Sequence, residues 1–96
     1  MPTKFCGYTV TTGYTQLDPI QGMCDVTLNN PTASPVYIVT GVSSSGAAAT
    51  LEASLQYISL AVTPNVLKIR CDPSQTWVKW TGATPGSNRY SCIIDW

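Results

Sequence analysis

The stretch Leu67-Lys-Ile-Arg-Cys71 alternates apolar and charged side chains, and this period of two decides the class of fold. Successive side chains of a β-strand point to opposite faces of a sheet, so the stretch predicts a strand with one buried and one solvated face. Cys24-Asp-Val-Thr-Leu28 shows the same alternation, with Asp25 and Thr27 on its polar face. The two stretches therefore predict half-buried strands.

Three more stretches have the character of strands. Tyr90-Ser-Cys-Ile-Ile-Asp-Trp96 places its Tyr, its Cys, one Ile and its Trp on one face, with Ser, Ile and Asp opposite. Val36-Tyr-Ile-Val39 and Trp77-Val-Lys-Trp80 are apolar on both faces. Such strands lie in the centre of a sheet, or one of their faces meets a partner.

Turn-forming residues divide the chain at short and regular intervals. Asp-Pro, Pro-Asn and Pro-Gly dipeptides stand at residues 18–19, 64–65, 72–73 and 85–86, with single Gly and Pro residues between them. The intervening segments have about five to ten residues, which is typical of β-sandwiches and barrels. We therefore expect an all-β fold, a single small β-sandwich or barrel-like domain of about six to eight short strands over residues 1–96. A Ser/Gly/Ala stretch at residues 41–49 is expected to form a flexible loop.

Residues 47–61 allow two interpretations. Leu51, Leu55 and Ile58 fit the apolar stripe of a helix, whereas alternate residues from Leu51 to Tyr57 fit a strand. The Ser, Val and Thr residues that follow favour a strand for the second half, because β-branched side chains suit a pleated surface. A single helical turn near residues 48–54 is the alternative that the sequence leaves open.

The charge content excludes several classes of function. Only 10% of the 96 residues are charged, the net charge is zero and histidine is absent, whereas about 25% charged residues is usual. Without histidine there is no Ser-His-Asp or Cys-His nucleophile pair and no His-ligated metal. Zero net charge removes the electrostatic basis for binding nucleic acid or an anionic membrane.

Four cysteines, Cys6, Cys24, Cys71 and Cys92, are the candidate structural cysteines. They are widely spaced and contain no Cys-x-x-Cys, so the spacing fits neither a zinc ribbon nor a thioredoxin-type site. Four cysteines permit three disulfide pairings, among which a sequence does not choose. Reduced thiols buried as small apolar side chains are an equally open interpretation.

The residues needed for catalysis are scarce. Five carboxylates stand at isolated positions with no sign of the pairing that a glycosidase requires. Asp18 and Asp72 each precede a proline, where turn formation explains them. The window Gly41-Val-Ser-Ser-Ser45 lacks the Gly-x-Ser-x-Gly pattern of a nucleophile elbow. We therefore expect no enzymatic activity, no catalytic residue, no metal and no cofactor.

Aromatic side chains are the candidates for a binding surface. Trp77 and Trp80 are three residues apart, so they lie on opposite faces of a strand and form no single platform by themselves. A core role is the simplest interpretation of these tryptophans. If one of them is exposed beside Tyr90 or Trp96, protein recognition follows, because Trp and Tyr dominate interface hot spots. The candidate interface is Trp77, Trp80, Tyr90 and Trp96.

A neutral surface favours association. A small domain with few charges and no net charge tends to associate, and obligate interfaces are more hydrophobic than free surfaces. No apolar run approaches the roughly 18 residues of a membrane span. The N-terminal residues lack a basic stretch followed by an apolar segment, so we expect no secretory signal.

Several stretches together resemble small virion proteins of tailed bacteriophages. They are the segment Leu28-Asn-Asn-Pro-Thr-Ala-Ser-Pro-Val-Tyr-Ile-Val39, the Ser/Gly/Ala loop, Pro64-Asn-Val-Leu-Lys-Ile-Arg70 and Thr76-Trp-Val-Lys-Trp80. The resemblance is to small β-rich proteins of the capsid-decoration or minor structural type, and it covers residues 28–94. It implies a particle subunit made in the host cytoplasm and exposed outside after lysis. It also implies homo-oligomers and contact with a major capsid or tail protein.

The sequence therefore predicts a non-enzymatic virus structural protein that stabilises a particle by protein–protein contacts, with no nucleic-acid or membrane partner. The alternative is a secreted or surface β-sandwich module that recognises carbohydrate or a receptor and is stapled by disulfides. Thiol counting and sizing chromatography separate the two hypotheses.

Overall fold

The computed structural model describes residues 2–9, 13–29, 35–60, 66–81 and 89–96. This part of the chain holds eight strands, one α-helix and one 3-10 helix. In chain order they are β1 Thr3–Thr9, β2 Thr15–Gln16, β3 Cys24–Asn29, β4 Val36–Thr40, α1 Ser45–Ala53, β5 Ile58–Leu60, β6 Val66–Cys71, η1 Pro73–Gln75, β7 Thr76–Trp80 and β8 Arg89–Asp95.

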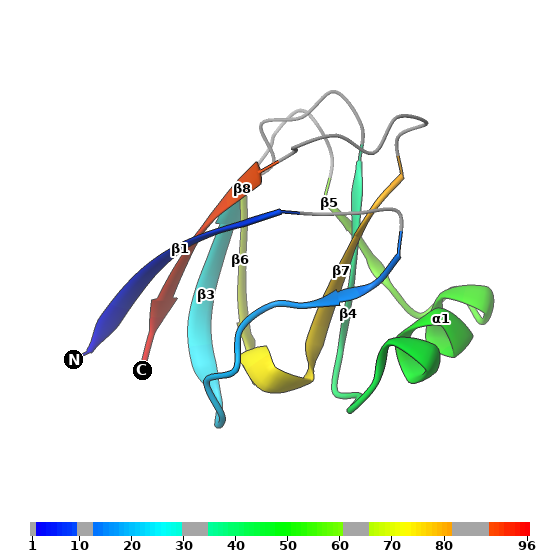
Figure 1. The fold of residues 1–96 in the computed structure, drawn as a ribbon, viewed down its shortest axis with the longest axis horizontal. Coiled ribbons are helices and arrows are strands. Elements are labelled where there is room, and N and C mark those ends of the chain that lie inside the picture. Colours follow the sequence, from blue (N-terminus) through cyan, green and yellow to red (C-terminus); the bar gives the residue numbers. More distant parts are fainter. Residues whose placement is uncertain (1, 10–12, 30–34, 61–65, 82–88) are drawn as a thin grey trace.

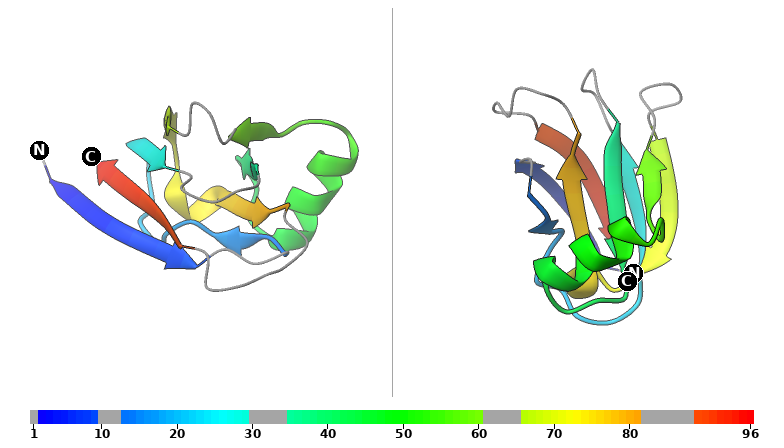
Figure 2. Two further views of the ribbon diagram at one scale, coloured as in Figure 1. Left: turned by 90° about the horizontal axis from the view of Figure 1, so that it is seen from above. Right: turned by 90° about the vertical axis from the view of Figure 1, so that its right-hand side faces the viewer.

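The strands form two four-stranded antiparallel sheets. Sheet A has the order β1-β8-β3-β6, and sheet B has the order β2-β7-β4-β5. The sheets lie face to face, with α1 on the far side of sheet B (Figures 1 and 2). The expected all-β fold is thus confirmed, and its form is a β-sandwich.

The alternating stretches form the strands that the sequence predicts. In β3, Cys24, Val26 and Leu28 are buried and the residues between them are not. In β6, Leu67 and Ile69 pack against the core, while Lys68 and Arg70 are exposed. The register pairs these two strands directly, with Val26 opposite Ile69 and Leu28 opposite Leu67.

The stretches that are apolar on both faces form strands with neighbours on both sides. β4 lies between β7 and β5, and β7 lies between β2 and β4. One side of sheet B contributes Val36, Ile38 and Val78 to the core between the sheets. Val39 is also 99% buried but lies outside that cluster, and strand alternation places it on the other side of β4, the strand that α1 contacts. The doubly apolar pattern of β4 therefore reflects two buried faces.

One buried cluster joins the two sheets. Its members from sheet A are Cys24, Val26, Leu28, Cys71, Cys92 and Ile94, and those from sheet B are Val36, Ile38, Leu60 and Val78, with Leu17 beside them. At about 25 cal/mol per Å² of apolar surface, burial of these side chains is the main stabilising contribution to the sandwich.

The predicted loop at residues 41–49 is wrong from Ser45 onward, because α1 begins there. The Ser44 side chain caps the helix by accepting a hydrogen bond from the Ala47 backbone N–H at 3.1 Å. The helix continues with three alanines at residues 47–49, and alanine has the highest helix propensity of any residue. The helical turn left open near residues 48–54 is thus present, and the second half of the ambiguous segment forms β5. Residue 61 of that segment, and residues 62 and 63 that follow it, lie outside the described part.

The helix ends in a left-handed residue. Leu55 has a φ of 60° and follows the C-cap residue Ser54. The Gln56 N–H donates to the Leu51 carbonyl at 2.8 Å, which closes the last turn in the manner of a Schellman motif. Glycine usually occupies this position, so the leucine stores backbone strain.

Both predicted Asp-Pro turns are present and use the carboxylate. Asp18 accepts the Ile20 N–H at 3.0 Å, and Asp72 accepts the Ser74 N–H at 3.0 Å. The Ser74 hydroxyl also donates to Asp72 at 2.6 Å, and this hydrogen bond lowers the pKa of Asp72. No helix among the described residues is long and apolar enough to cross a bilayer.

Candidate functional site

The two sheets differ in what covers their outer faces. Helix α1 lies over sheet B, and no helix of the described part lies over sheet A (Figure 2). We call the outer face of sheet A the A face and define it by two rows of side chains in the strand register. The first row is Phe5, Ile93, Thr27 and Lys68. The second row is Thr3, Asp95, Asp25 and Arg70.

The second row forms two polar pairs across the strands. The Thr3 hydroxyl donates to an Asp95 oxygen at 2.6 Å. The Arg70 guanidinium donates to an Asp25 oxygen at 3.1 Å, and both side chains of this ion pair are about 60% exposed. An ion pair with that exposure contributes little to stability, in general up to about 1 kcal/mol.

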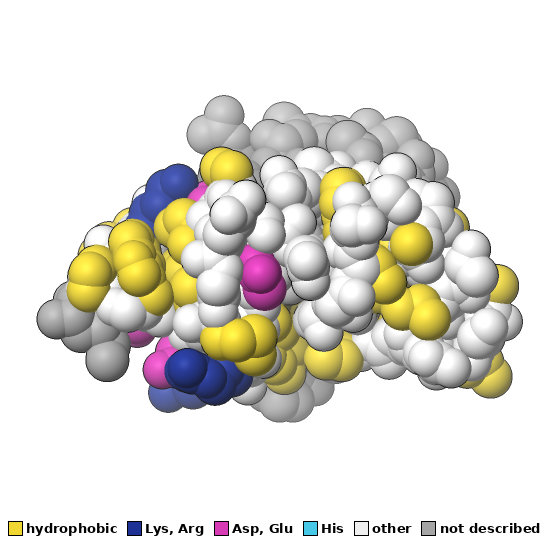
Figure 3. Space-filling view, turned by 90° about the horizontal axis from the view of Figure 1, so that it is seen from below, with side chains coloured by type: hydrophobic (Ala, Val, Ile, Leu, Met, Phe, Trp, Pro, Cys, Tyr) yellow, Lys and Arg dark blue, Asp and Glu magenta, His cyan; other side chains and the backbone are white. Residues whose placement is uncertain are grey.

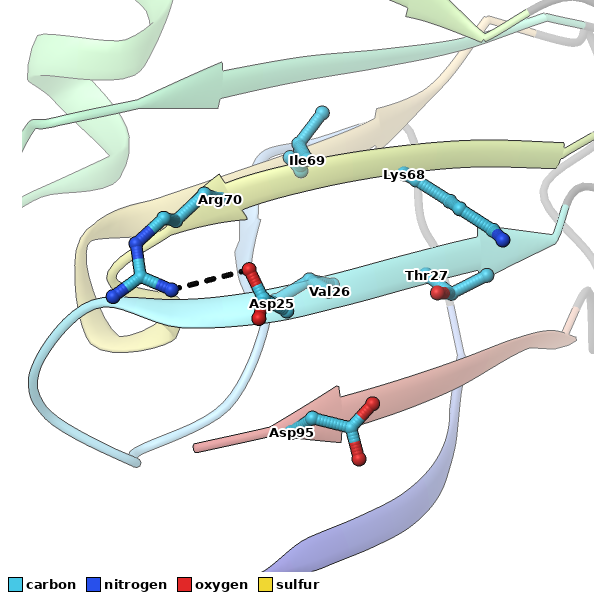
Figure 4. Close-up of a pocket in the computed structure, with 7 residues that line it drawn as sticks. All are labelled: Asp25, Val26, Thr27, Lys68, Ile69, Arg70 and Asp95. Atoms are coloured by element: carbon cyan, nitrogen blue, oxygen red, sulfur yellow. Dashed lines mark hydrogen bonds and ion pairs between the residues drawn. The ribbon is translucent and has the colours of Figure 1, made fainter. Parts of the chain in front are cut away.

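Next to these pairs the A face is hollowed. The hollow has a volume of about 420 Å³ and lies over β3, β6 and the end of β8. Figure 4 shows Arg70 directed toward Asp25, Lys68 further along β6, and Asp95 on the neighbouring strand. In the space-filling view of Figure 3, the charged side chains gather over sheet A and η1, and none lies over α1 on that face.

Two carboxylates stand side by side on the A face, which their isolated sequence positions did not predict. Asp25 and Asp95 are directly opposite in the pairing of β3 with β8. Each has its own hydrogen-bond donor, from Arg70 and Thr3 respectively. The Asp25 side chain is 59% exposed, and Asp95 is partly buried.

Phe5 is the most exposed aromatic side chain of the described part. Its side chain is 76% exposed, in the middle of β1. β1 is seven residues long and forms one edge of sheet A. Lys4, the charge next to Phe5, binds Asp18 at 2.8 Å. An exposed strand edge is a template for pairing with another chain, and a neighbouring aromatic side chain adds apolar contact.

The predicted interface residues do not gather on one strand or one sheet. Trp77 is half-buried on β7 in sheet B, where its indole N–H donates to the Val42 carbonyl at 2.9 Å. Trp96 follows β8 in sheet A and is 45% exposed. The register places Trp80 opposite Val36 and Tyr90 opposite Tyr8. The side chains of Trp80 and Tyr90 lie outside the described part of the structure, so the exposure of these two predicted residues stays untested.

A second polar group lies on the other side of the sandwich, between α1 and sheet B. Glu52 of α1 binds Lys79 of β7 at 2.5 Å and accepts a hydrogen bond from the Tyr14 hydroxyl at 3.1 Å. The Lys79 ammonium also lies 5.3 Å from the Tyr14 ring centre and 5.7 Å from that of Tyr37. Both charged side chains are only about one-quarter exposed.

One further tyrosine, Tyr57, extends this group, which we call the tyrosine cluster: Tyr14, Tyr37, Tyr57, Glu52 and Lys79. The rings of Tyr37 and Tyr57 stack with centres 4.3 Å apart. Burial, the hydrogen bond to Glu52 and the charge of Glu52 raise the pKa of Tyr14. A hydrogen bond with Tyr37 raises the pKa of Tyr57. The cluster holds α1 and its C-terminal segment on sheet B, so its evident role is structural.

The sequence did not predict either group of side chains. Phe5 lies in a stretch without clear alternation, and the five members of the tyrosine cluster come from five separate parts of the chain. The alternation of Asp25, Lys68 and Arg70 with core residues was the one usable signal for the A face. It placed those charges on a solvated face but left open which strands are neighbours.

The strand register brings the candidate structural cysteines together in pairs. Cys24 is opposite Cys71, and Cys6 is opposite Cys92. Cys24, Cys71 and Cys92 are buried, and Cys24 and Cys71 are both thiols. Among the described residues, no three His, Cys, Asp or Glu side chains form a group that could hold a metal ion.

Comparison of the chain with models of protein families, with curated proteins and with solved structures gives no match.

Proposed function

We propose that this protein is a non-enzymatic structural subunit of a virus particle, and that it docks on other subunits through the A face. The observation that carries the proposal is the outer face of sheet A, which no helix of the described part covers and which has Phe5 76% exposed at its edge. An exposed aromatic side chain on an uncovered sheet is the kind of anchor that protein interfaces bury.

The polar part of the A face supports the same proposal. Asp25, Asp95, Lys68 and Arg70 present both signs of charge around the hollow. Charges of both signs let an interface select its partner and its register, because like charges brought together cost several kcal/mol. The neutral sum of these charges also agrees with a subunit that is covered in an assembly.

The virion context rests on the resemblance of the segments 28–39, 64–70 and 76–80 to small phage structural proteins. A compact sandwich with one covered and one bare outer face is suitable for a protein that sits on a larger shell. The bare side docks, and the helix side faces away.

Co-expression with the products of the neighbouring genes tests the proposal. We expect the chain to co-elute in sizing chromatography with a capsid or tail protein, or to form a homo-oligomer. Phe5→Ser is expected to weaken this association at least tenfold. The matched control is Leu55→Ser, which removes a side chain of nearly equal exposure, 79%, at the end of α1. A chain that stays monomeric alone and with every such partner, or equal weakening by both variants, contradicts the proposal.

One observation favours the second candidate, a secreted or surface binding module stapled by disulfides. All four cysteines stand opposite another cysteine in the register, and disulfide-stapled domains are typical of oxidising compartments. Alkylation of the protein from its natural source separates the candidates. Alkylation of all four thiols contradicts the secreted module, whereas the absence of any alkylated thiol agrees with it.

A further inference from the structure

The four cysteines occupy both outer strand pairs of sheet A. Cys24 on β3 is directly opposite Cys71 on the edge strand β6, and Cys92 on β8 is directly opposite Cys6 on the edge strand β1. Directly opposite residues of an antiparallel pair have Cα atoms about 4.5 or 5.5 Å apart. Both values fall in the range of about 4.4 to 6.8 Å that a disulfide needs.

The same register excludes the other two pairings. Cys92 is two strands from Cys71, and it is opposite Leu28, four positions along β3 from Cys24. Four positions correspond to about 13 Å. Cys6 and Cys71 lie on opposite edges of the sheet, three strand spacings or about 14 Å apart. Each alternative pairing requires one of these long separations, far beyond the limit of about 7 Å.

The surroundings of Cys24 and Cys71 are those of a stable, slowly reacting pair. Their exposed fractions are 1% and 3%. The Cys24 thiol donates to the Gly22 carbonyl at 3.3 Å. Burial raises the pKa of both thiols, which keeps them protonated at neutral pH and slows their reaction. An oxidant therefore reaches them during folding or when the edge strand opens.

We infer that, in an oxidising environment, this chain closes two cross-strand disulfides, Cys24–Cys71 and Cys6–Cys92, and no others. The reaction with a low-molecular-weight disulfide such as oxidised glutathione proceeds in two exchanges. One cysteine thiolate attacks the oxidant and releases one thiol, and the opposite cysteine then displaces the second. Each bond oxidises two protein thiols, which lose two hydrogen atoms, and reduces one oxidant molecule to two thiols.

The positions of the bonds give them a common physical effect. Each disulfide ties one edge strand of sheet A to its inner neighbour, and Cys6–Cys92 also links the strands nearest the two chain ends. Edge strands have a neighbour on one side only, so they are the strands that open first. Oxidation therefore locks both edges of the sheet that carries the A face. This inference is independent of which partner the A face binds.

The full chain, refolded in a buffer of reduced and oxidised glutathione, tests the pairing. Intact mass with alkylation is expected to show the loss of four hydrogen atoms and no alkylated thiol. Digestion without reduction is expected to release Cys24–Cys71 and Cys6–Cys92 peptides. We expect the midpoint of thermal unfolding to lie on the order of 10 °C above that of the reduced chain. Any other linked pair as the main product, or thiols that stay alkylatable after refolding, overturns the inference.

Double variants provide a matched control. Cys6→Ala with Cys92→Ala leaves the opposite pair Cys24 and Cys71, and Cys24→Ala with Cys92→Ala leaves Cys6 and Cys71 on opposite edges. Both remove two thiols, and both retain two. The first is expected to close one disulfide in the monomer, and the second to retain two alkylatable thiols in the monomer. Equal closure in both overturns the inference, and the wild-type peptide map remains decisive if a variant does not fold.

Discussion

The two outer faces of the sandwich use their side chains differently. Beneath α1, sheet B presents Val39, which is 99% buried together with Ala48 of the helix. The A face instead carries the polar side chains that alternate with core residues along β3 and β6, and it leaves Phe5 76% exposed. The first face is covered by α1, and no helix of the described residues covers the second. Burial, rather than hydrophobic character alone, therefore distinguishes a structural side chain from a candidate interface side chain.

Helix α1 is held by a small apolar contact and a larger polar one. Ala48 is its one buried residue, and its small side chain lets the helix approach the sheet. The tyrosine cluster supplies the rest through Glu52, Lys79 and Tyr14. On the A face, the corresponding ion pair of Asp25 and Arg70 joins the neighbouring strands β3 and β6, and both of its side chains are about 60% exposed. Charged side chains are therefore expected to contribute differently to the free energy of unfolding on the two faces.

The largest expected difference is between two apolar truncations. Val39→Ala removes two methyl groups from the buried contact under α1 and is expected to cost about 2 kcal/mol of unfolding free energy. Phe5→Ala removes a much larger side chain but is expected to change stability by less than about 0.5 kcal/mol. Urea denaturation measures both. A larger loss for Phe5→Ala would show that the A face is covered within the chain.

The next largest expected difference is between the contributions of the two ion pairs to stability. Glu52→Gln keeps a hydrogen-bond acceptor for Tyr14 but leaves the Lys79 charge without its carboxylate, and we expect a loss of about 1 kcal/mol. Asp25→Asn on the A face is expected to change stability by less than about 0.5 kcal/mol, since both partners are exposed to solvent. Equal losses in urea denaturation would contradict the assigned difference between the faces.

On the helix side, Tyr14 is expected to contribute to the loss of stability at alkaline pH, in addition to Cys24 and Cys71 of sheet A, because burial also raises the pKa of these two thiols. The folded protein raises the pKa of Tyr14 above its unfolded value of about 10. The unfolded state therefore loses this proton first, and stability falls as the pH rises above about 10. Tyr14→Phe is expected to flatten this fall between pH 8 and 11, and Thr3→Val on the A face is expected to leave it unchanged. Unfolding measured across that range checks both variants, and an unchanged slope in Tyr14→Phe would contradict this assignment.

The smallest expected effect is at the end of α1. Leu55→Gly relieves the left-handed backbone at a φ of 60° and is expected to stabilise the protein by about 0.5 kcal/mol. Gly41, at a φ of 80°, provides the reverse control, because Gly41→Ala introduces the same kind of strain. We expect thermal unfolding to shift upward for the first variant and downward for the second. A downward shift for Leu55→Gly would mean that its exposed side chain makes a stabilising contact.

The period of two allowed much of sheet A to be predicted from sequence. β3, β6 and β8 carry alternating residues that match their burial, because each has one face on the core. The helix was only partly predictable. Its sequence Ser-Gly-Ala-Ala-Ala-Thr-Leu-Glu-Ala has a weak apolar stripe and a single buried residue, so periodicity carries little signal there. The Ser44 cap and the alanine run were the available signals, and they are local.

The candidate site was less predictable, for a different reason. Trp77 is conspicuous in the sequence, but its indole N–H donates a hydrogen bond to the Val42 carbonyl within the chain. Phe5 is inconspicuous, and its exposure follows from β1 being an edge strand. The pairs Asp25 with Asp95 and Cys24 with Cys71 depend on which strands are neighbours and in what register. A single sequence contains no direct record of those long-range pairings.

By itself, the sequence determined that this chain forms short strands with a neutral, charge-poor surface, because strand alternation and turn chemistry are local properties of neighbouring residues. Only the tertiary structure decided which outer face α1 covers, which carboxylates lie together and which cysteines stand opposite one another. Those features arise from contacts between residues distant in the chain. Their pairing is set by the collective burial of one core, and no short stretch of sequence specifies it.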